Sequence, residues 1–273
     1  MTILQQIVSE TRARLAENTD SSYRAELEKM AERHAPRGFR QRLVGRSRTG
    51  PAVIAELKKA SPSKGVIRAD FRVVELARAM EQAGAAALSV LTEEKHFQGS
   101  LENLRLASAA VSIPCLRKDF IVDELQMLEA RAFGGDAVLL IVAALDDSEL
   151  KQLRRAAQGL QLDVLCEVHD EHELQRAADA GFDIIGVNNR DLRTFQVALE
   201  TSLRLNANIP SNALRVAESG IHAGLDIARL RSAGYQAFLI GESLMKERDP
   251  GEALSKLLAD AVCEERRAEV ASR

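Results

Sequence analysis

The sequence has no tryptophan, two tyrosines and three cysteines among its 273 residues. Cys115, Cys166 and Cys263 are odd in number, widely spaced and without a Cys-x-x-Cys pair, which argues against a disulfide framework and against a structural zinc site. Long hydrophobic runs are also missing. No stretch approaches the roughly 20 apolar residues of a membrane-spanning helix, and the first residues lack the basic and then apolar order of a signal peptide. We therefore expect a cytoplasmic protein whose cysteines are packed or free thiols.

An excess of charge of one sign is missing as well. The 37 basic and 40 acidic residues leave a formal net charge of -3, which gives no electrostatic reason to expect nucleic acid or an anionic membrane as partner. Any anion must therefore bind at a local site. With 46% apolar and 28% charged residues, the chain has the composition of a globular protein that can bury a full core.

Four glycines recur where a helical pattern gives way to an apolar run. Gly84, Gly134, Gly181 and Gly234 follow one another at intervals of 50, 47 and 53 residues, and glycine suits the left-handed position just past a helix end. Each interval is about twice the length of one βα unit in a barrel of eight units. A further strand is therefore expected midway, and apolar stretches lie at the expected places: AVIAELKK (52–59), IPCLRKDF (113–120), LDVLCEVH (162–169) and ALRVAESG (213–220).

Eight strand patterns alternating with helical patterns predict a (β/α)8 barrel. Two amphipathic helical patterns, in residues 3–15 and 23–31, precede the first strand. We expect residues 1–47 to form an N-terminal helical extension of a single domain that spans residues 1–273. The alternative is an open, doubly wound sheet, which usually carries a glycine-rich fingerprint after its first strand; none is present here.

Ionisable and polar residues close several of the predicted strands. Catalytic residues of a barrel sit at the carboxyl ends of the strands, and these ends carry Glu56, Lys58, Lys118, Glu167, Asn188, Arg190, Glu218 and Ser219. One such residue alone is more often a solvated loop residue. A charge that faces the barrel interior must be paired or solvated, however, so the whole set favours a functional site over core.

Strand parity and two glycine loops add to this interpretation. If Lys118 and Glu167 point into the barrel, then Cys115, Arg117 and Cys166 point outward to the helices. The loops after the last two strands often build a phosphate site on this fold. Here they contain AESGI (217–221) and IGESLM (240–245), in which glycine lets the backbone approach an anion and serine can donate; Ser61 and Ser63 could add hydroxyls.

Six segments together resemble one known family. They are AELKKASPSKG (55–65), LTEEKHFQGS (91–100), LRKDFIVDELQ (116–126), GVNNRDLRTF (186–195), AESGI and IGESLM. In this order, over most of the chain, they resemble the indole-3-glycerol-phosphate synthase family of tryptophan biosynthesis, and the start of the chain resembles that family's N-terminal extension, which helps form the substrate site. The resemblance implies a monofunctional lyase that closes 1-(2-carboxyphenylamino)-1-deoxyribulose 5-phosphate to an indole with loss of carbon dioxide and water.

The resemblance also implies roles for individual residues. Lys118 is the expected general acid, Glu167 the expected general base, and Lys58 a second acid or a substrate ligand. Three residues are expected to orient these groups and the substrate hydroxyls: Glu56, Asn188 and Glu218. Arg190 is assigned to the substrate carboxylate. Phosphate binding is assigned to Ser61, Ser219, Gly220, Gly241 and Glu242. The apolar slot for the aromatic ring is assigned to Phe97, Phe120, Leu139, Leu192 and Leu239, of which the leucines could equally be core.

The expected partner is a phosphorylated small molecule, with no nucleic acid and no membrane. The resemblance implies no cofactor and no metal, in agreement with five scattered histidines that assemble no ligand cluster. His96, His169 and His172 lie in polar stretches and are expected to face solvent, although His169 shares a strand face with Glu167. We expect a monomer, and a homodimer stays open.

Two other functions stay open. One is a Schiff-base aldolase on the same fold, in which Lys118 or Lys58 is a covalent nucleophile rather than an acid. The other is a phosphate-binding barrel without catalysis. It would be expected to lack Lys58, Lys118 or Glu167, and all three are present.

Overall fold

The fold is a closed barrel of parallel strands. The computed structural model describes residues 2–17 and 21–271. Strand β10 hydrogen-bonds to β1 and thereby closes the sheet. This confirms the predicted (β/α)8 barrel and excludes the alternative of an open, doubly wound sheet. The eight strands are β1 (Ala52–Leu57), β4 (Ala87–Leu91), β5 (Cys115–Lys118), β6 (Ala137–Ile141), β7 (Asp163–Val168), β8 (Ile184–Asn188), β9 (Leu214–Glu218) and β10 (Ala237–Ile240).

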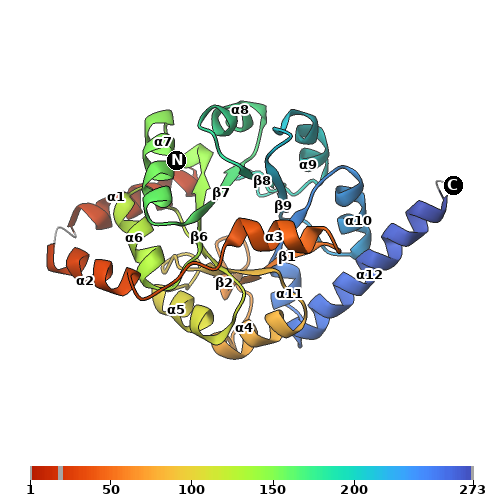
Figure 1. Ribbon diagram of the computed structural model, residues 1–273, viewed down its shortest axis with the longest axis horizontal. Coiled ribbons are helices and arrows are strands. Elements are labelled where there is room, and N and C mark those ends of the chain that lie inside the picture. The colour runs from red at the N-terminus through yellow and green to blue at the C-terminus, as the bar shows by residue number, and fades with distance from the viewer. Residues whose placement is uncertain (1, 18–20, 272–273) are drawn as a thin grey trace.

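Helices follow the strands along the chain and cover the outside of the barrel (Figure 1). They are α4 (Val73–Gln82), α5 (Leu101–Ala110), α6 (Glu124–Ala132), α7 (Asp147–Gly159), α8 (Glu171–Asp179), α9 (Glu200–Leu205), α10 (Gly224–Ser232) and α12 (Pro250–Ala271), with a short helix α11 (Glu242–Met245) after β10 and 3-10 turns at Val142–Ala144 and Asn206–Asn208. Gly84, Gly134, Gly181 and Gly234 have φ angles of 97°, 84°, 78° and 105°. This confirms that each occupies the left-handed position between a helix and a strand.

Three helices, and not the predicted two, precede the barrel. The predicted pair corresponds to α1 (Ile3–Glu17) and α2 (Ser21–Ala31). The third, α3 (Phe39–Ser47), was missed because FRQRLVGRS is short, strongly charged and interrupted by glycine, so that it has no clear helical stripe.

Helix α3 closes the barrel at the amino ends of the strands. Phe39 and Leu43 are fully buried in the apolar cluster inside the barrel. That cluster contains residues that begin strands, such as Ala52, Ala137 and Ile184. In Figure 1, α3 runs across the middle of the molecule in front of the strands. One end of the barrel is therefore filled by side chains, which leaves the other end for a site.

The predicted strand parity is confirmed. Cys115 and Cys166 belong to the larger apolar cluster between the barrel and the helices, and both are free thiols, as is the exposed Cys263. Arg117 also points outward, where its Nη1 lies 2.9 Å from Glu129 Oε2 of α6 and its Nη2 lies 2.9 Å from Asp119 Oδ2. The neighbours of these residues on the strands therefore point into the barrel.

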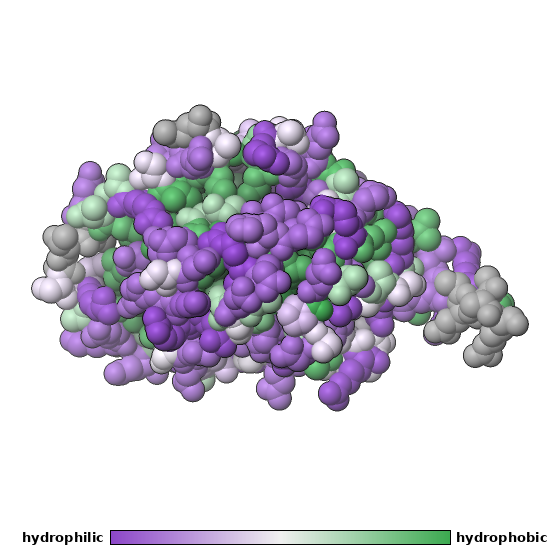
Figure 2. All heavy atoms as spheres, turned by 90° about the horizontal axis from the view of Figure 1, so that it is seen from above, coloured by the Kyte–Doolittle hydropathy of each residue, from purple (hydrophilic) through white to green (hydrophobic). Residues whose placement is uncertain are grey.

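The surface carries one small element that was not predicted. A hairpin of β2 (Ala60–Ser61) and β3 (Gly65–Val66) follows β1, with strands too short for a sequence pattern. Polar residues predominate on the face that Figure 2 shows, and apolar residues are visible there in a few patches. Within residues 2–17 and 21–271, none of the helices has the length and apolar character needed to cross a membrane.

Candidate active site

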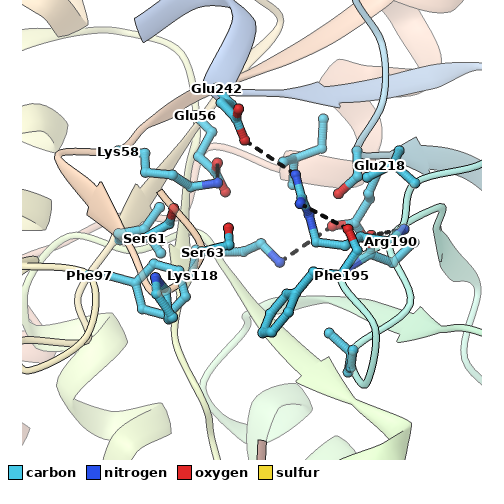
Figure 3. A pocket seen from close by; sticks show the side chains of 18 of the residues that line it. Glu56, Lys58, Ser61, Ser63, Phe97, Lys118, Arg190, Phe195, Glu218 and Glu242 are labelled. Atoms are coloured by element: carbon cyan, nitrogen blue, oxygen red, sulfur yellow. Dashed lines mark hydrogen bonds and ion pairs between the residues drawn. The ribbon is translucent and has the colours of Figure 1, made fainter. Parts of the chain in front are cut away.

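A pocket of about 500 Å³ lies at the carboxyl ends of the strands (Figure 3). Charged residues at the ends of β1, β5, β7 and β9 line it together, because all parallel strands of a barrel end at the same rim. Every residue that the sequence assigned to a site lines this pocket: Glu56, Lys58, Ser61, Phe97, Lys118, Phe120, Leu139, Glu167, Asn188, Arg190, Leu192, Glu218, Ser219, Gly220, Leu239, Gly241 and Glu242.

The ammonium group of Lys118 is the centre of the charged cluster. Its Nζ lies 2.9 Å from Glu167 Oε2 and 3.4 Å from Glu218 Oε2. Burial lowers the pKa of Lys118, but the negative charges around it, that of Glu167 first, outweigh burial and raise the pKa above its ordinary value. Lys118 therefore holds its proton at neutral pH.

The two carboxyl groups beside Lys118 titrate in opposite directions. Burial raises the pKa of Glu167, but the charge of Lys118 and the neighbouring His169 outweigh burial and hold the pKa below its ordinary value. Burial also raises the pKa of Glu218. The charge of Lys118 lowers this pKa, but burial together with the neighbouring Glu167 outweighs Lys118, and the pKa reaches about 8. At neutral pH the cluster thus presents one ionised carboxylate, one protonated carboxyl group and one ammonium group.

Glu56 and Lys58 form an ion pair at the end of β1. Their spacing of two residues places both side chains on one face of the strand, as the sequence predicts. Gly241 follows the neighbouring strand β10 and lies against Glu56. A Cβ atom at position 241 would lie only 2.9 Å from Glu56 Cβ, so a larger residue would displace this carboxylate.

The loops after β9 and β10 form a second, more open part of the pocket. Ser219 and Gly220 both have positive φ angles, 65° and 77°, an arrangement that turns the backbone sharply at the end of β9. Arg190 Nη2 lies 3.2 Å from Glu242 Oε2, and Lys246 also pairs with Glu242. Burial raises the pKa of Glu242, but these cations outweigh it and lower the pKa below its ordinary value.

The hairpin after β1 brings further polar groups to this side. Ser61, Ser63 and Lys64 line the pocket with the preceding Lys58. Ser61 Oγ is buried and makes no hydrogen bond within the part of the chain that the structure describes. A buried hydroxyl without a partner is a donor available to a ligand.

Apolar side chains also line the pocket. The rings of Phe97 and Phe120 are tilted against each other with centroids 6.0 Å apart, a common geometry for an aromatic pair. Leu139 and Leu239 are almost fully buried in the barrel interior and reach the floor of the pocket. A planar ring could therefore lie beside the charged cluster without exposing its faces to water.

Part of the pocket lining was missed at the sequence level. Ile3, Leu4 and Ile7 of α1 line it. The family resemblance implies that the N-terminal extension helps form the substrate site, but the sequence analysis assigned none of these three residues to the site. Phe195 and Val197, in the loop after β8, also line it. This loop has no periodic pattern. Phe195 ends the segment GVNNRDLRTF that carries the family resemblance, which was the one signal that could have placed it in the site.

The predicted solvent exposure is wrong for two histidines. The side chains of His96 and His169 are only 14% and 13% exposed, because each ring lies against the carboxylate groups of neighbouring residues in the fold. His96 Nε2 lies 3.1 Å from Glu10 Oε2 of α1. His169 is enclosed between Glu167 and Glu173. His172 is exposed, as predicted.

A closed eight-stranded barrel with a cluster of charged residues at the carboxyl ends of its strands has the arrangement in which (β/α)8-barrel enzymes carry their active sites. The family model described as indole-3-glycerol phosphate synthase matches residues 4–257. The indole-3-glycerol phosphate synthase of Koribacter versatilis is 62% identical over 93% of this chain and 98% of its own, and that of Acidithiobacillus ferrooxidans is 50% identical over 94% and 99%. The chain belongs to the indole-3-glycerol phosphate synthase family.

Solved structures with low sequence identity share the barrel. A mandelate oxidase mutant superposes with a TM-score of 0.59 at 20% identity, covering 79% of this chain and 73% of its own. The structure titled "Native KDPGal structure" superposes with a TM-score of 0.56 at 17% identity, covering 79% and 95%. At these identities the likeness extends to the fold alone.

Proposed function

We propose that the protein is an indole-3-glycerol phosphate synthase that converts 1-(2-carboxyphenylamino)-1-deoxyribulose 5-phosphate to indole-3-glycerol phosphate, carbon dioxide and water. The family is one of carboxy-lyases in tryptophan biosynthesis. The observation that carries the proposal is the Lys118 ammonium, held 2.9 Å from Glu167 and 3.4 Å from Glu218 beside an aromatic wall. This arrangement pairs a proton donor with a proton acceptor where a planar substrate can lie.

Lys118 is the proposed general acid of ring closure. The ring carbon that bears the carboxylate attacks the ketone carbon of the substrate, and Lys118 gives its proton to the ketone oxygen, which becomes a hydroxyl group. Loss of carbon dioxide then returns the electron pair of the broken bond to the ring. The raised pKa of Lys118 supports this role because the amine is protonated before the substrate binds.

Glu167 is the proposed general base of the following dehydration. The new hydroxyl group leaves as water after protonation by Lys58 or by Lys118, and Glu167 removes the proton that restores the aromatic indole. Its low pKa supports this role because the carboxylate is ionised at neutral pH. Glu56, Asn188 and Glu218 are proposed to orient the catalytic groups and the substrate hydroxyls.

The remaining residues are proposed to bind the two ends of the substrate. The phosphate lies at the loops after β9 and β10, against Ser219 and the backbone of Gly220 and Gly241, with Ser61 and Glu242 at the same end. Arg190 is proposed to bind the substrate carboxylate, for which a planar guanidinium offers two parallel donors. The aromatic ring lies against Phe97, Phe120, Leu139, Leu192 and Leu239. We further propose that residues 1–273 form one domain and act as a monomer.

Indole fluorescence tests the function directly, because the chain has no tryptophan and only two tyrosines. The purified protein is mixed with the carboxyphenylamino deoxyribulose phosphate, and indole emission is followed. Wild-type protein should produce the signal, and Lys118→Arg should lower kcat by about 10²–10⁴-fold, the usual contribution of a general acid. Arginine keeps the charge among the carboxylates but does not release its proton, so the variant should stay folded.

Lys151→Ala is the matched control, because Lys151 is exposed on α7 and should be replaceable without loss of turnover. Circular dichroism verifies that each variant is folded. Folded wild-type protein without turnover of this substrate would refute the proposal. The aldolase alternative predicts instead that borohydride with a sugar phosphate traps an adduct on Lys118 or Lys58, whereas the synthase predicts no adduct.

A further inference from the structure

One titratable side chain that the mechanism above does not use lies next to the proposed base. His169 follows β7 directly and lies two residues after Glu167, so both side chains are on the same face. His169 Nε2 lies 3.4 Å from Glu167 Oε1. The other oxygen of the same carboxylate, Oε2, lies 2.9 Å from Lys118 Nζ. Each oxygen of Glu167 thus faces a different nitrogen.

The imidazole ring of His169 is held from its opposite side. Its Nδ1 lies 2.9 Å from Glu173 Oε2, and its backbone N–H donates to the same oxygen at 2.8 Å. Glu173 is itself fixed in the first turn of α8, where its backbone N–H donates to the carboxylate of Asp170 at 2.8 Å. Because Nδ1 faces a carboxylate, this nitrogen carries a proton, and the second nitrogen is left to face Glu167.

We propose that His169 is a positioning residue for Glu167, in a row of carboxylate, imidazolium and carboxylate that runs from Glu173 through His169 to the proposed base. The inference rests on the proposed role of Glu167. The ring fixes the plane of the Glu167 carboxylate through Oε1, which leaves Oε2 at the correct angle to Lys118 and the substrate. A carboxylate held only by Lys118 could rotate about its last bond, and the base would then lose alignment.

The charges around the ring favour its protonated form. Burial lowers the pKa of His169, but Glu167 and Glu173 on its two sides outweigh burial and raise the pKa to about 10. Other charged groups nearby have partners elsewhere. Arg176 of α8 pairs with Asp147 and with backbone carbonyl oxygens, and Lys118 pairs with Glu167 and Glu218. The buried Nε2 has no well-formed hydrogen bond in the part of the chain described, so its 3.4 Å approach to Glu167 is an ion pair that a small shift could shorten.

The contact with Glu167 is not needed for the local fold. The backbone N–H of residue 169 already donates to Glu173, so any residue except proline keeps the start of α8 intact. The ring adds one thing that the backbone cannot supply, which is a cationic donor directed at Glu167. A purely structural role of His169 and a positioning role therefore predict different effects on activity when the ring is replaced by the side-chain amide of glutamine or of asparagine.

Two conservative variants separate the two ring nitrogens. In His169→Gln the side-chain amide nitrogen takes the place of Nε2 and can still donate to Glu167. In His169→Asn the shorter side chain places its amide nitrogen near Nδ1 and can donate only to Glu173. We expect His169→Asn to lower kcat by about 10–100-fold with KM within about threefold, whereas His169→Gln should stay within about fivefold of wild type. His172→Asn, at an exposed position three residues away, is the matched control and should be fully active.

The pH profile supplies a readout that a structural role would not move. Loss of the imidazolium beside Glu167 should raise the pKa of this carboxylate, so the acidic limb of kcat/KM should shift to higher pH in His169→Asn by about one pH unit. Wild-type kcat and an unchanged acidic limb in His169→Asn would overturn the proposal. Greater damage in His169→Gln than in His169→Asn would also overturn it, because the ring would then serve Glu173 alone.

A spectroscopic measurement tests the contact without turnover. In protein labelled with ¹⁵N-histidine, both ring nitrogens of His169 should be protonated at pH 7, and Glu167→Gln should lower the pH at which the ring loses a proton. A ring that titrates near its ordinary pKa of about 6.5 in both proteins would refute the contact. If the wild-type protein did not convert the substrate while the ring behaved as expected, the proposed function would fail and the contact would stand.

Discussion

Replacement of Gly186 by alanine should damage the site from inside the barrel. Gly186 lies in the middle of β8, paired with Glu167 on one side and with Val216 on the other. A Cβ atom at this position would lie 3.3 Å from Glu218 Cδ and closer still to its carboxylate oxygen, and 3.0 Å from Leu165 Cδ1. Position 186 has no positive φ angle, so the backbone accepts alanine and the effect is steric alone.

The size of the effect follows from this clash. The added methyl group must push the Glu218 carboxylate away from Lys118 or bend β8, and such overpacking costs about 1–3 kcal/mol of unfolding free energy. The displaced carboxyl group should also lower kcat by about 10–100-fold, since a shift of about 1 Å in a catalytic cluster has this effect. Urea unfolding and the indole fluorescence assay measure the two quantities on the same sample.

A double mutant identifies the cause. In Gly186→Ala/Glu218→Ala the carboxylate that meets the new methyl group is gone, so the losses of unfolding free energy in the two single mutants should not add. The loss in the double mutant should be about 1–3 kcal/mol smaller than the sum of the two single-mutant losses. Gly45→Ala is the control. Within the described part of the chain a Cβ atom there meets nothing within 4 Å, and alanine inside helix α3 should stabilise the protein by about 0.5–1 kcal/mol. Additive losses in the double mutant would refute the steric explanation.

Three further predictions concern stability. Arg117→Ala leaves Asp119 and Glu129 without the guanidinium that now lies 2.9 Å from each, and it should lower the unfolding free energy by about 3–5 kcal/mol; an unchanged urea midpoint would contradict this. Phe39→Ala empties the fully buried position at the amino end of the barrel and should cost about 3–5 kcal/mol in the same assay, while a loss below about 1 kcal/mol would mean that α3 does not close the barrel. Glu218→Gln should become more stable relative to wild type as the pH rises from 5 to 9. The pKa of Glu218 is raised to about 8 in the folded protein, so its contribution to stability is complete below its ordinary pKa and is lost as the pH rises through 8. A pH-independent difference between the two proteins would show that Glu218 is not protonated in the folded state.

Much of the site could be predicted because a barrel converts sequence position into spatial position in a simple way. Once the glycines and apolar runs identify eight strands, the last residues of these strands must meet at one rim. The alternation of side chains then decides that Lys118 and Glu167 face inward while Arg117 and Cys166 face outward. These steps need only the local sequence pattern and the alternation of side chains along a strand, and the structure confirms both.

Two of the errors have the opposite origin, since they concern contacts between segments far apart in the chain. Helix α3 has a weak helical signal of its own and is stabilised by the burial of Phe39 and Leu43 in the barrel. His96 is covered because α1 brings Glu10 to within 3.1 Å of it. Neither outcome can be read from the flanking residues, because tertiary packing outweighs local preference for short or polar segments.

By itself, the sequence determined the strands, the side of each strand that faces the pocket, and the family resemblance, because strand period, glycine joints and contiguous motifs are local properties. Only the tertiary structure decided the protonation states of the cluster and the neighbours of Glu167. Burial and the distances of 2.9 Å to Lys118 and 3.4 Å to His169 set these properties. A pKa depends on the solvent and the charges that surround a group in space, and these exist only once the barrel has closed.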